Sequence, residues 1–166
     1  MFREMRRKNQ ALTKEECQAI LQQGSSGVLA LVGDEGYPYA VPMSYVSDER
    51  SIWFHCAKSG YKLDAITQNG KASFCVIEED QVVPREYTTY FRSVIVFGQM
   101  RILQDEGEKR RAIEKLASKY APSDSEAERQ RAIQKEYPAL CVLELTIQHI
   151  SGKEAIELAR RKKAIQ

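Results

Sequence analysis

The stretch WFHCAKSGYKLDAI, which runs from Trp53 to Ile66, changes its pattern half-way along. Its first residues form an apolar, aromatic run that is typical of a β-strand. After the turn at Ser59 and Gly60, the spacing of Leu63 and Ile66 is that of one face of a helix. The stretch therefore predicts a strand that passes through a tight turn into a short helix.

The turn in this stretch has the chemistry of a phosphate-binding site. Gly60, Tyr61 and Lys62 begin the helix, where backbone N–H groups have no intrahelical partner and the helix dipole adds partial positive charge. Lys58 and Lys62 flank the same point, and such junctions bind phosphate groups. Small and basic residues also cap and solvate ordinary helices, so this second interpretation remains open on the residues alone.

The sequence before this stretch predicts an antiparallel meander, because short apolar runs alternate with polar turns. The expected strands are 27–32, 37–46 and 52–57, with turns at 34–36 and 47–50. Pro38 and Pro42 lie within the second run. Because proline has no amide donor, this strand must be bulged or lie at an edge of the sheet.

The sequence after the stretch predicts three more strands and several helices. The strands are expected at 72–78, 87–103 and 141–148, with a polar loop at 79–86. Thr13 and Glu16 form a capping box at the start of a helix that Gly24 can end in a left-handed conformation. Further helices are expected from Asp105 to Pro122, over 125–136 and over 154–163.

Six strands with no regular β-α-β alternation favour a mainly β fold, namely an antiparallel barrel with helices packed outside it. The length of 166 residues fits one domain. We therefore expect a single domain over 1–166, with a helical extension at about 153–166.

The composition excludes several functional classes. Lys and Arg number 25 and Asp and Glu number 23, so the net charge of +2 gives no reason to expect a nucleic-acid partner. No apolar run approaches the ~20 residues of a membrane span, and the basic N-terminus lacks the features of a secretory signal. The four cysteines are scattered and the two histidines lie far apart. We expect a cytoplasmic protein with reduced cysteines and no metal site.

Three motifs together resemble the flavoproteins of the pyridoxamine-phosphate-oxidase-like split-barrel superfamily. They are Tyr37-Pro-Tyr-Ala-Val-Pro-Met-Ser-Tyr45, the stretch from Ile52 to Ile66, and Arg92-Ser-Val-Ile-Val-Phe-Gly98. Within the superfamily the chain is most similar to the nitroimidazole-resistance (Nim) proteins, from Met5 to about Ser151. This resemblance implies a six-stranded FMN-binding split barrel that forms a homodimer.

The resemblance also implies which residues bind the cofactor. Lys62 matches the phosphate lysine, and Lys58, Gly60 and Tyr61 complete the turn described above. Ser93 and Val94 match positions through which the partner subunit reaches the same flavin. The remaining matched positions line the isoalloxazine and ribityl groups or contact the cofactor at the end of a strand: Val41, Pro42, Met43, Ser44, His55 and Cys56.

The chain departs from the oxidases of the superfamily at two places. Tyr61 stands where they usually carry an arginine before the phosphate lysine, and 150–166 lacks their Arg-containing substrate motif. We therefore do not expect oxidation of vitamin B6. The leading hypothesis is a Nim-like oxidoreductase that passes electrons from NAD(P)H through FMN to a small organic acceptor such as a nitroaromatic.

The catalytic residues are not determined by the sequence, and His55 is the best candidate because imidazole suits proton transfer near neutral pH. An alternative hypothesis is a non-enzymatic flavin or haem binder, in which His55 would be the axial ligand. A barrel kept only for protein–protein contact is the third. We interpret His149 as structural, and Cys56 as a packed thiol despite the positive charge near it.

Overall fold

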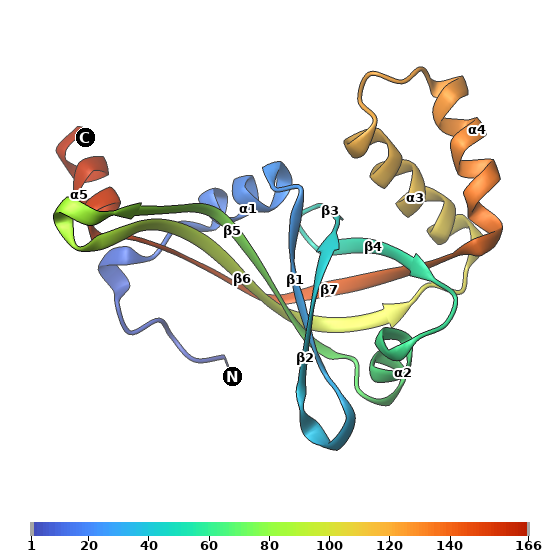
Figure 1. The fold of residues 1–166 in the computed structure, drawn as a ribbon, viewed down its shortest axis with the longest axis horizontal. Helices are drawn as coiled ribbons and strands as arrows, with labels where there is room; N and C mark the ends of the chain where they lie inside the picture. The colour runs from blue at the N-terminus through green and yellow to red at the C-terminus, as the bar shows by residue number, and fades with distance from the viewer. Residues whose placement is uncertain (1, 166) are drawn as a thin grey trace.

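The computed structural model describes residues 2–165 and contains one antiparallel sheet of seven strands, ordered β2-β1-β5-β6-β7-β4-β3 (Figure 1). The strands are β1 (Ser26–Val32), β2 (Pro38–Ser44), β3 (Val46–Ser47), β4 (Ser51–Ala57), β5 (Lys71–Val83), β6 (Thr88–Ile102) and β7 (Leu140–Glu154). The helices are α1 (Lys14–Gln23), α2 (Tyr61–Gln68), α3 (Glu106–Tyr120), α4 (Glu126–Glu136) and α5 (Ile156–Ile165). Short 3₁₀ helices are η1 (Lys8–Gln10), η2 (Asp34–Gly36), η3 (Pro84–Glu86) and η4 (Tyr137–Ala139). The expected mainly β class with flanking helices is confirmed.

The expected count of six strands is wrong by one, because the run 37–46 is divided at Tyr45. The hydroxyl of Tyr120 accepts from the Tyr45 amide at 2.8 Å and lies 3.0 Å from its carbonyl oxygen. These groups are therefore engaged by a side chain, and β2 and β3 separate at this residue. The strands β2 and β3 form the two edges of the sheet. Among residues 2–165 no backbone pairing joins β2 to β3, so the barrel stays open between them.

The strand β2 is an edge strand, as its prolines predict. It pairs only with β1, where Pro42 lies opposite Val28 and Pro38 lies opposite Val32. An edge position leaves one side of the strand without a partner, so two missing amide donors cost little there.

The polar loop expected at 79–86 is wrong, because most of it continues the sheet. After a bulge between Ile77 and Glu79, β5 pairs with β6 as far as Val83 opposite Thr88. Pro84 then begins η3, which closes the hairpin. Figure 1 shows this hairpin extending from the barrel towards α5, at the end opposite α2.

Two apolar clusters hold the sheet and its helices. The larger fills the barrel, where Phe54, Phe74 and Leu143 are fully buried. The smaller lies outside it, where Ile113 and Leu116 of α3 and Ile133 of α4 cover the opposite face of β7. Because β7 is covered on both faces, residues 141–145 are all buried, and exposed residues alternate with less exposed ones only from Thr146 to His149.

The helix boundaries follow local sequence signals with two exceptions. Thr13 accepts from the amide of Glu16 and the Glu16 carboxylate returns to the Thr13 amide, which confirms the capping box. Gly24 is extended (φ −62°, ψ 138°) rather than left-handed. The last helix begins at Ile156, later than expected, because β7 continues to Glu154. No helix among residues 2–165 has the length and hydrophobicity needed to span a bilayer.

Candidate functional site

The turn between β4 and α2, residues 58–62, gathers hydrogen-bond donors and positive charge. Gly60 adopts φ +131°, a conformation that only glycine adopts easily, and a Cβ there would meet open space. Its carbonyl accepts from the amides of Leu63 and Asp64. The amides of Tyr61 and Lys62 have no backbone acceptor outside their helix among residues 2–165.

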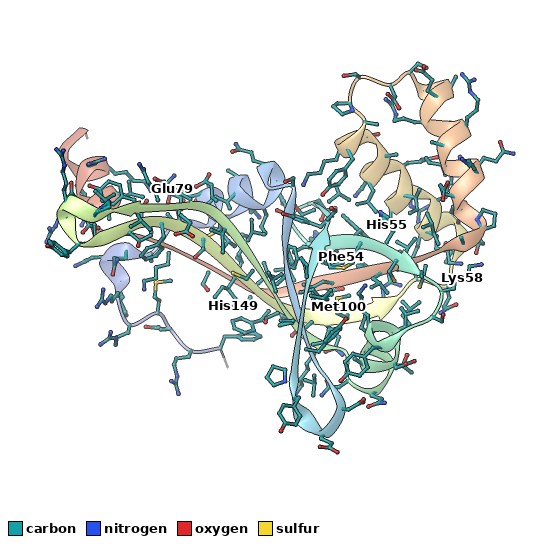
Figure 2. The ribbon with its side chains drawn as sticks, viewed as in Figure 1. Phe54, His55, Lys58, Glu79, Met100 and His149 are labelled. Carbon is teal, nitrogen blue, oxygen red and sulfur yellow. The ribbon has the colours of Figure 1, made fainter. Side chains whose placement is uncertain are left out.

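The two lysines of this turn complete the donor set. Lys58 is exposed and Lys62 is half-buried, and neither forms an ion pair with another described residue. Figure 2 shows Lys58 where β4 ends. Two ammonium groups beside free amides at a helix start are the donors that a phosphate monoester requires, so this part of the site fits FMN.

The side chain of Tyr61 belongs to the neighbouring hairpin. Its hydroxyl accepts from the Asp34 amide at 2.6 Å, and its ring meets the ring of Tyr39 edge-on, with 4.7 Å between centroids. Where the oxidases carry an arginine, this chain uses an aromatic residue to fasten the β1–β2 hairpin to α2. Phosphate recognition here therefore depends on the lysines and the backbone.

His55 lies on the outer face of β4. Ile52 and Phe54 point into the barrel and are fully buried, whereas His55 is exposed. With Ser44 it lines a groove of about 340 Å³ beneath α3 and α4. The structure thus brings Ser44 of β2 and His55 of β4 to one groove.

Cys56 points the other way. It lies opposite Cys141 and packs against the barrel core. Burial raises the pKa of the Cys56 thiol to about 11, and the smaller opposing effect comes from the nearby charge of Lys62. The thiol therefore stays protonated at neutral pH, as expected for a packed cysteine, and only the backbone of Cys56 is available to a ligand.

The four matched residues of β2 divide between its two faces. Met43 is buried in the barrel and Val41 packs against the same core. Pro42 and Ser44 are exposed on the outer face. A ligand on the outer face would meet the side chains of Pro42 and Ser44, and only the backbone of the other two.

Ser93 and Val94 lie on β6, in the part that enters the long hairpin. Ser93 pairs with Ile77, whereas Val94 is fully buried in the barrel core. These two residues are not brought to the turn at 58–62 by their own chain. This arrangement leaves the prediction that they act from a partner subunit untested.

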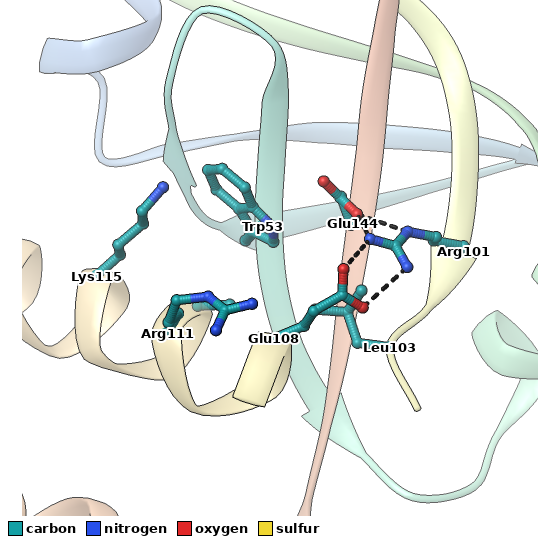
Figure 3. A pocket seen from close by; sticks show the side chains of 8 residues that line it. Trp53, Arg101, Leu103, Glu108, Arg111, Lys115 and Glu144 are labelled. Carbon is teal, nitrogen blue, oxygen red and sulfur yellow. Dashed lines mark hydrogen bonds and ion pairs between the residues drawn. The ribbon is translucent and has the colours of Figure 1, made fainter. Parts of the chain in front are cut away.

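A second pocket, of about 170 Å³, lies between β4, β6 and α3 (Figure 3). Arg101 donates to both carboxylate oxygens of Glu108, at 2.8 and 3.0 Å, and to Glu144 at 2.6 Å. The ammonium of Lys115 lies 3.9 Å from the Trp53 ring centroid. Because these charges are largely satisfied inside the protein, the cluster fastens α3 to the sheet.

Sequence reasoning did not foresee the helical wall of the groove at His55. Ile113, Leu116 and Tyr120 follow a helical periodicity, which indicates one apolar face of a helix but not what lies against it. Tyr120 is 43% exposed, and its place in the same groove as His55 depends on tertiary packing. His149 stacks on Phe2 at 4.9 Å between centroids, in agreement with a structural role. Residues 2–165 contain no group of three side chains suited to a metal ion.

A family model described as pyridoxamine 5′-phosphate oxidase matches residues 13–154. The chain belongs to the pyridoxamine 5′-phosphate oxidase family. This family membership confirms the superfamily that the three sequence motifs indicated. No curated protein matches the chain.

Solved structures share the fold of this pyridoxamine 5′-phosphate oxidase family member. A candidate 5-nitroimidazole antibiotic resistance protein from Bacteroides thetaiotaomicron has a TM-score of 0.71 at 19% identity, over 87% of this chain and 86% of that one. The flavocytochrome Anf3 from Azotobacter vinelandii has a TM-score of 0.76 at 22% identity, over 92% and 72%. An FAD- and haem-binding protein from Mycobacterium smegmatis has a TM-score of 0.73 at 23% identity, over 89% and 74%.

Proposed function

We propose that this protein binds FMN and acts as an oxidoreductase on a small organic acceptor. The observation that carries the proposal is the turn at 58–62, where Lys58, Lys62 and the helix-start amides of Tyr61 and Lys62 share one short segment between β4 and α2. The fold is shared with a protein described as binding FAD and haem and with one described as a flavocytochrome. FMN, which carries one phosphate group, is favoured over FAD, which carries two, because the turn offers one compact set of donors.

In this proposal the residues of the chain bind and orient the cofactor. Lys62 and the amides of Tyr61 and Lys62 hold the phosphate, while Pro42, Ser44 and His55 contact the flavin from the outer faces of β2 and β4. Bound FMN would accept a hydride from NAD(P)H and pass electrons on. His55 is the group placed to donate a hydrogen bond or a proton to the reacting molecule.

The acceptor is proposed to be a small nitroaromatic compound. The Bacteroides protein, with the same fold, is described in terms of 5-nitroimidazole resistance. The groove beside His55 has the volume for one small aromatic molecule.

We also propose a homodimer that forms through the outer face of β1, β5 and β6. Val28, Ile77, Ile95 and Phe97 are large apolar residues that are exposed there, and Val28 and Ile95 both flank Cys75 across the sheet. Ser93 shares this face, so a partner subunit docked here would present Ser93 to the other chain. A monomer in light scattering, at concentrations that saturate the protein with FMN, would overturn this arrangement.

Haem binding is the second candidate function, and one observation favours it. His55 is exposed beside a groove whose lining is mostly apolar, which suits a single axial ligand. If haem is the resident group, the purified protein will show a Soret band and His55→Ala will abolish it.

The test of the proposed function is a visible spectrum followed by an FMN titration. Flavin absorption at about 450 nm, with fluorescence quenching that saturates at one FMN per chain, is the expected result. A protein that binds neither FMN nor haem would show that the fold is kept here without this function.

A further inference from the structure

The groove beneath α3 and α4 is a cavity that the proposed flavin contacts do not account for. Its volume is about 340 Å³, and it continues from the candidate flavin site because Ser44 and His55 lie on its rim. The remaining lining comes from the helices and from the start of β7: Ile113, Leu116, Ala117, Tyr120, Ala132, Ile133, Glu136 and Leu140.

One wall of the groove is held firmly. The Tyr120 hydroxyl is bound by the backbone of Tyr45 and by the Ser25 carbonyl. Lys119 reaches the Gly24 carbonyl at 2.5 Å, with its ammonium 4.2 Å from the Tyr45 ring centroid. Because the hydroxyl of Tyr120 is engaged, it is the aromatic ring that remains for a ligand, and a fixed ring suits stacking.

The polarity of the groove selects against anions. Most of its lining is apolar, and Glu136 is the only acidic or basic side chain in it apart from His55. His55 and Ser44, on the sheet side, are the groups that can direct one polar atom of a ligand. A neutral flat ring with one hydrogen-bond acceptor matches this arrangement, whereas a carboxylate would be desolvated against apolar walls and near Glu136.

We propose that this groove binds the acceptor, a neutral planar aromatic molecule that stacks near Tyr120 and accepts a hydrogen bond from His55. The α3–α4 hairpin is then the part of the chain that determines acceptor specificity. This inference rests on the proposed function, because only that function makes the ligand an electron acceptor. Binding of a ligand in the groove can nevertheless be measured without turnover.

The test uses two variants of α4 and two probes. Ala132→Phe places a ring in the groove, and Ala127→Phe places the same ring at an exposed position of the same helix that does not line the groove. The probes are 4-nitrobenzyl alcohol, which is neutral, and 4-nitrobenzoate, its anionic counterpart. Binding of each is measured by calorimetry on the full chain with and without FMN, and FMN is titrated into every variant.

We expect 4-nitrobenzyl alcohol to bind about tenfold more tightly than 4-nitrobenzoate. Ala132→Phe should lower the affinity for 4-nitrobenzyl alcohol by about tenfold or more and leave the affinity for FMN unchanged. Ala127→Phe should leave both affinities unchanged. Ala132→Leu, with a smaller side chain, should give an intermediate loss and guards against misfolding of the larger variant.

Three results separate this inference from the proposed function. If Ala132→Phe weakens FMN as much as the alcohol, the groove holds the flavin itself and the inference is overturned. It is also overturned if the alcohol does not bind or binds the Ala132→Phe variant normally. If the chain binds no FMN but shows the expected pattern with the probes, the groove inference stands and the proposed function fails.

Discussion

Two places at opposite ends of the long sheet, the hairpin cluster around Glu154 and the turn at 58–62, use their charged residues in opposite ways. At the hairpin end, Arg92 contacts Glu78 at 3.0 Å and Glu154 at 3.2 Å. Lys162 of α5 contacts Glu154 at 2.9 Å and Glu16 of α1 at 2.5 Å. At the other end, Lys58 and Lys62 have no such partners among the described residues.

This difference separates structural charge from charge that is available to a ligand. Glu154 is only 3% exposed and is neutralised from two sides, as a buried carboxylate must be. The lysines of the turn form no ion pair with another described residue and share their segment with helix-start amides, an arrangement that favours the binding of an anion. Uncompensated charge, rather than charge itself, marks the candidate site.

The largest effect is expected from Arg92→Met, which removes one partner of the buried Glu154. Breaking a buried ion pair strongly lowers the free energy of unfolding. Because Lys162 still neutralises Glu154, we expect a loss at the low end of that range, about 3 kcal/mol. Urea unfolding measures it, and FMN affinity of the folded protein should be unchanged. A loss of FMN binding without a loss of stability would contradict the division between the two ends.

Lys62→Ala tests the opposite end. We expect FMN affinity to fall by about 10- to 100-fold, because a charge-assisted contact to phosphate contributes roughly 1.5 to 3 kcal/mol. The melting temperature should not change, because Lys62 is half-buried without an ion-pair partner. Lys71→Ala, at an exposed position on β5, is the matched control and should bind FMN normally.

His55→Ala should have a smaller effect on the same titration. Loss of one hydrogen bond predicts about a three- to tenfold weaker FMN affinity. Circular dichroism should show an unchanged fold, because the side chain is exposed. Wild-type affinity together with wild-type turnover in this variant would remove His55 from the site.

The smallest effect concerns Glu16 and its dependence on pH. The hydrogen bond from Lys162 holds the pKa of Glu16 below its ordinary value of 4.5. A lowered folded-state pKa stabilises the protein above the ordinary value, and this contribution is lost as the pH falls through the folded value. Glu16→Gln should therefore lower stability by less than about 1 kcal/mol at pH 7. Thermal melts should show the difference disappearing below pH 4.5; a constant difference at all pH values would contradict the linkage.

Local signals in the sequence were sufficient for most elements of the fold. The capping box at Thr13, the edge strand with Pro38 and Pro42, and the strand–turn–helix around Gly60 each depend on a few neighbouring residues. These features are determined by backbone chemistry that is visible in the residues themselves.

The errors arose where distant residues decide the structure. Residues 79–83, expected in a polar loop, form a strand because β6 supplies a partner for them. The run 37–46 is divided because Tyr120 binds the backbone of Tyr45. For the same reason the sequence could propose His55 but not the groove beside it. The helices that complete that groove are joined to β4 only by tertiary packing.

The central claim is that the turn at 58–62 recognises a phosphate group, and a comparison of FMN with riboflavin tests it most directly. The two ligands share the ring and ribityl chain and differ in the phosphate alone. The account predicts that wild-type protein binds FMN about 10- to 100-fold more tightly than riboflavin, and that Lys62→Ala removes most of this difference by weakening FMN only. Equal affinities for the two ligands in the wild-type protein, or a preference for FMN that survives in Lys62→Ala, would contradict it.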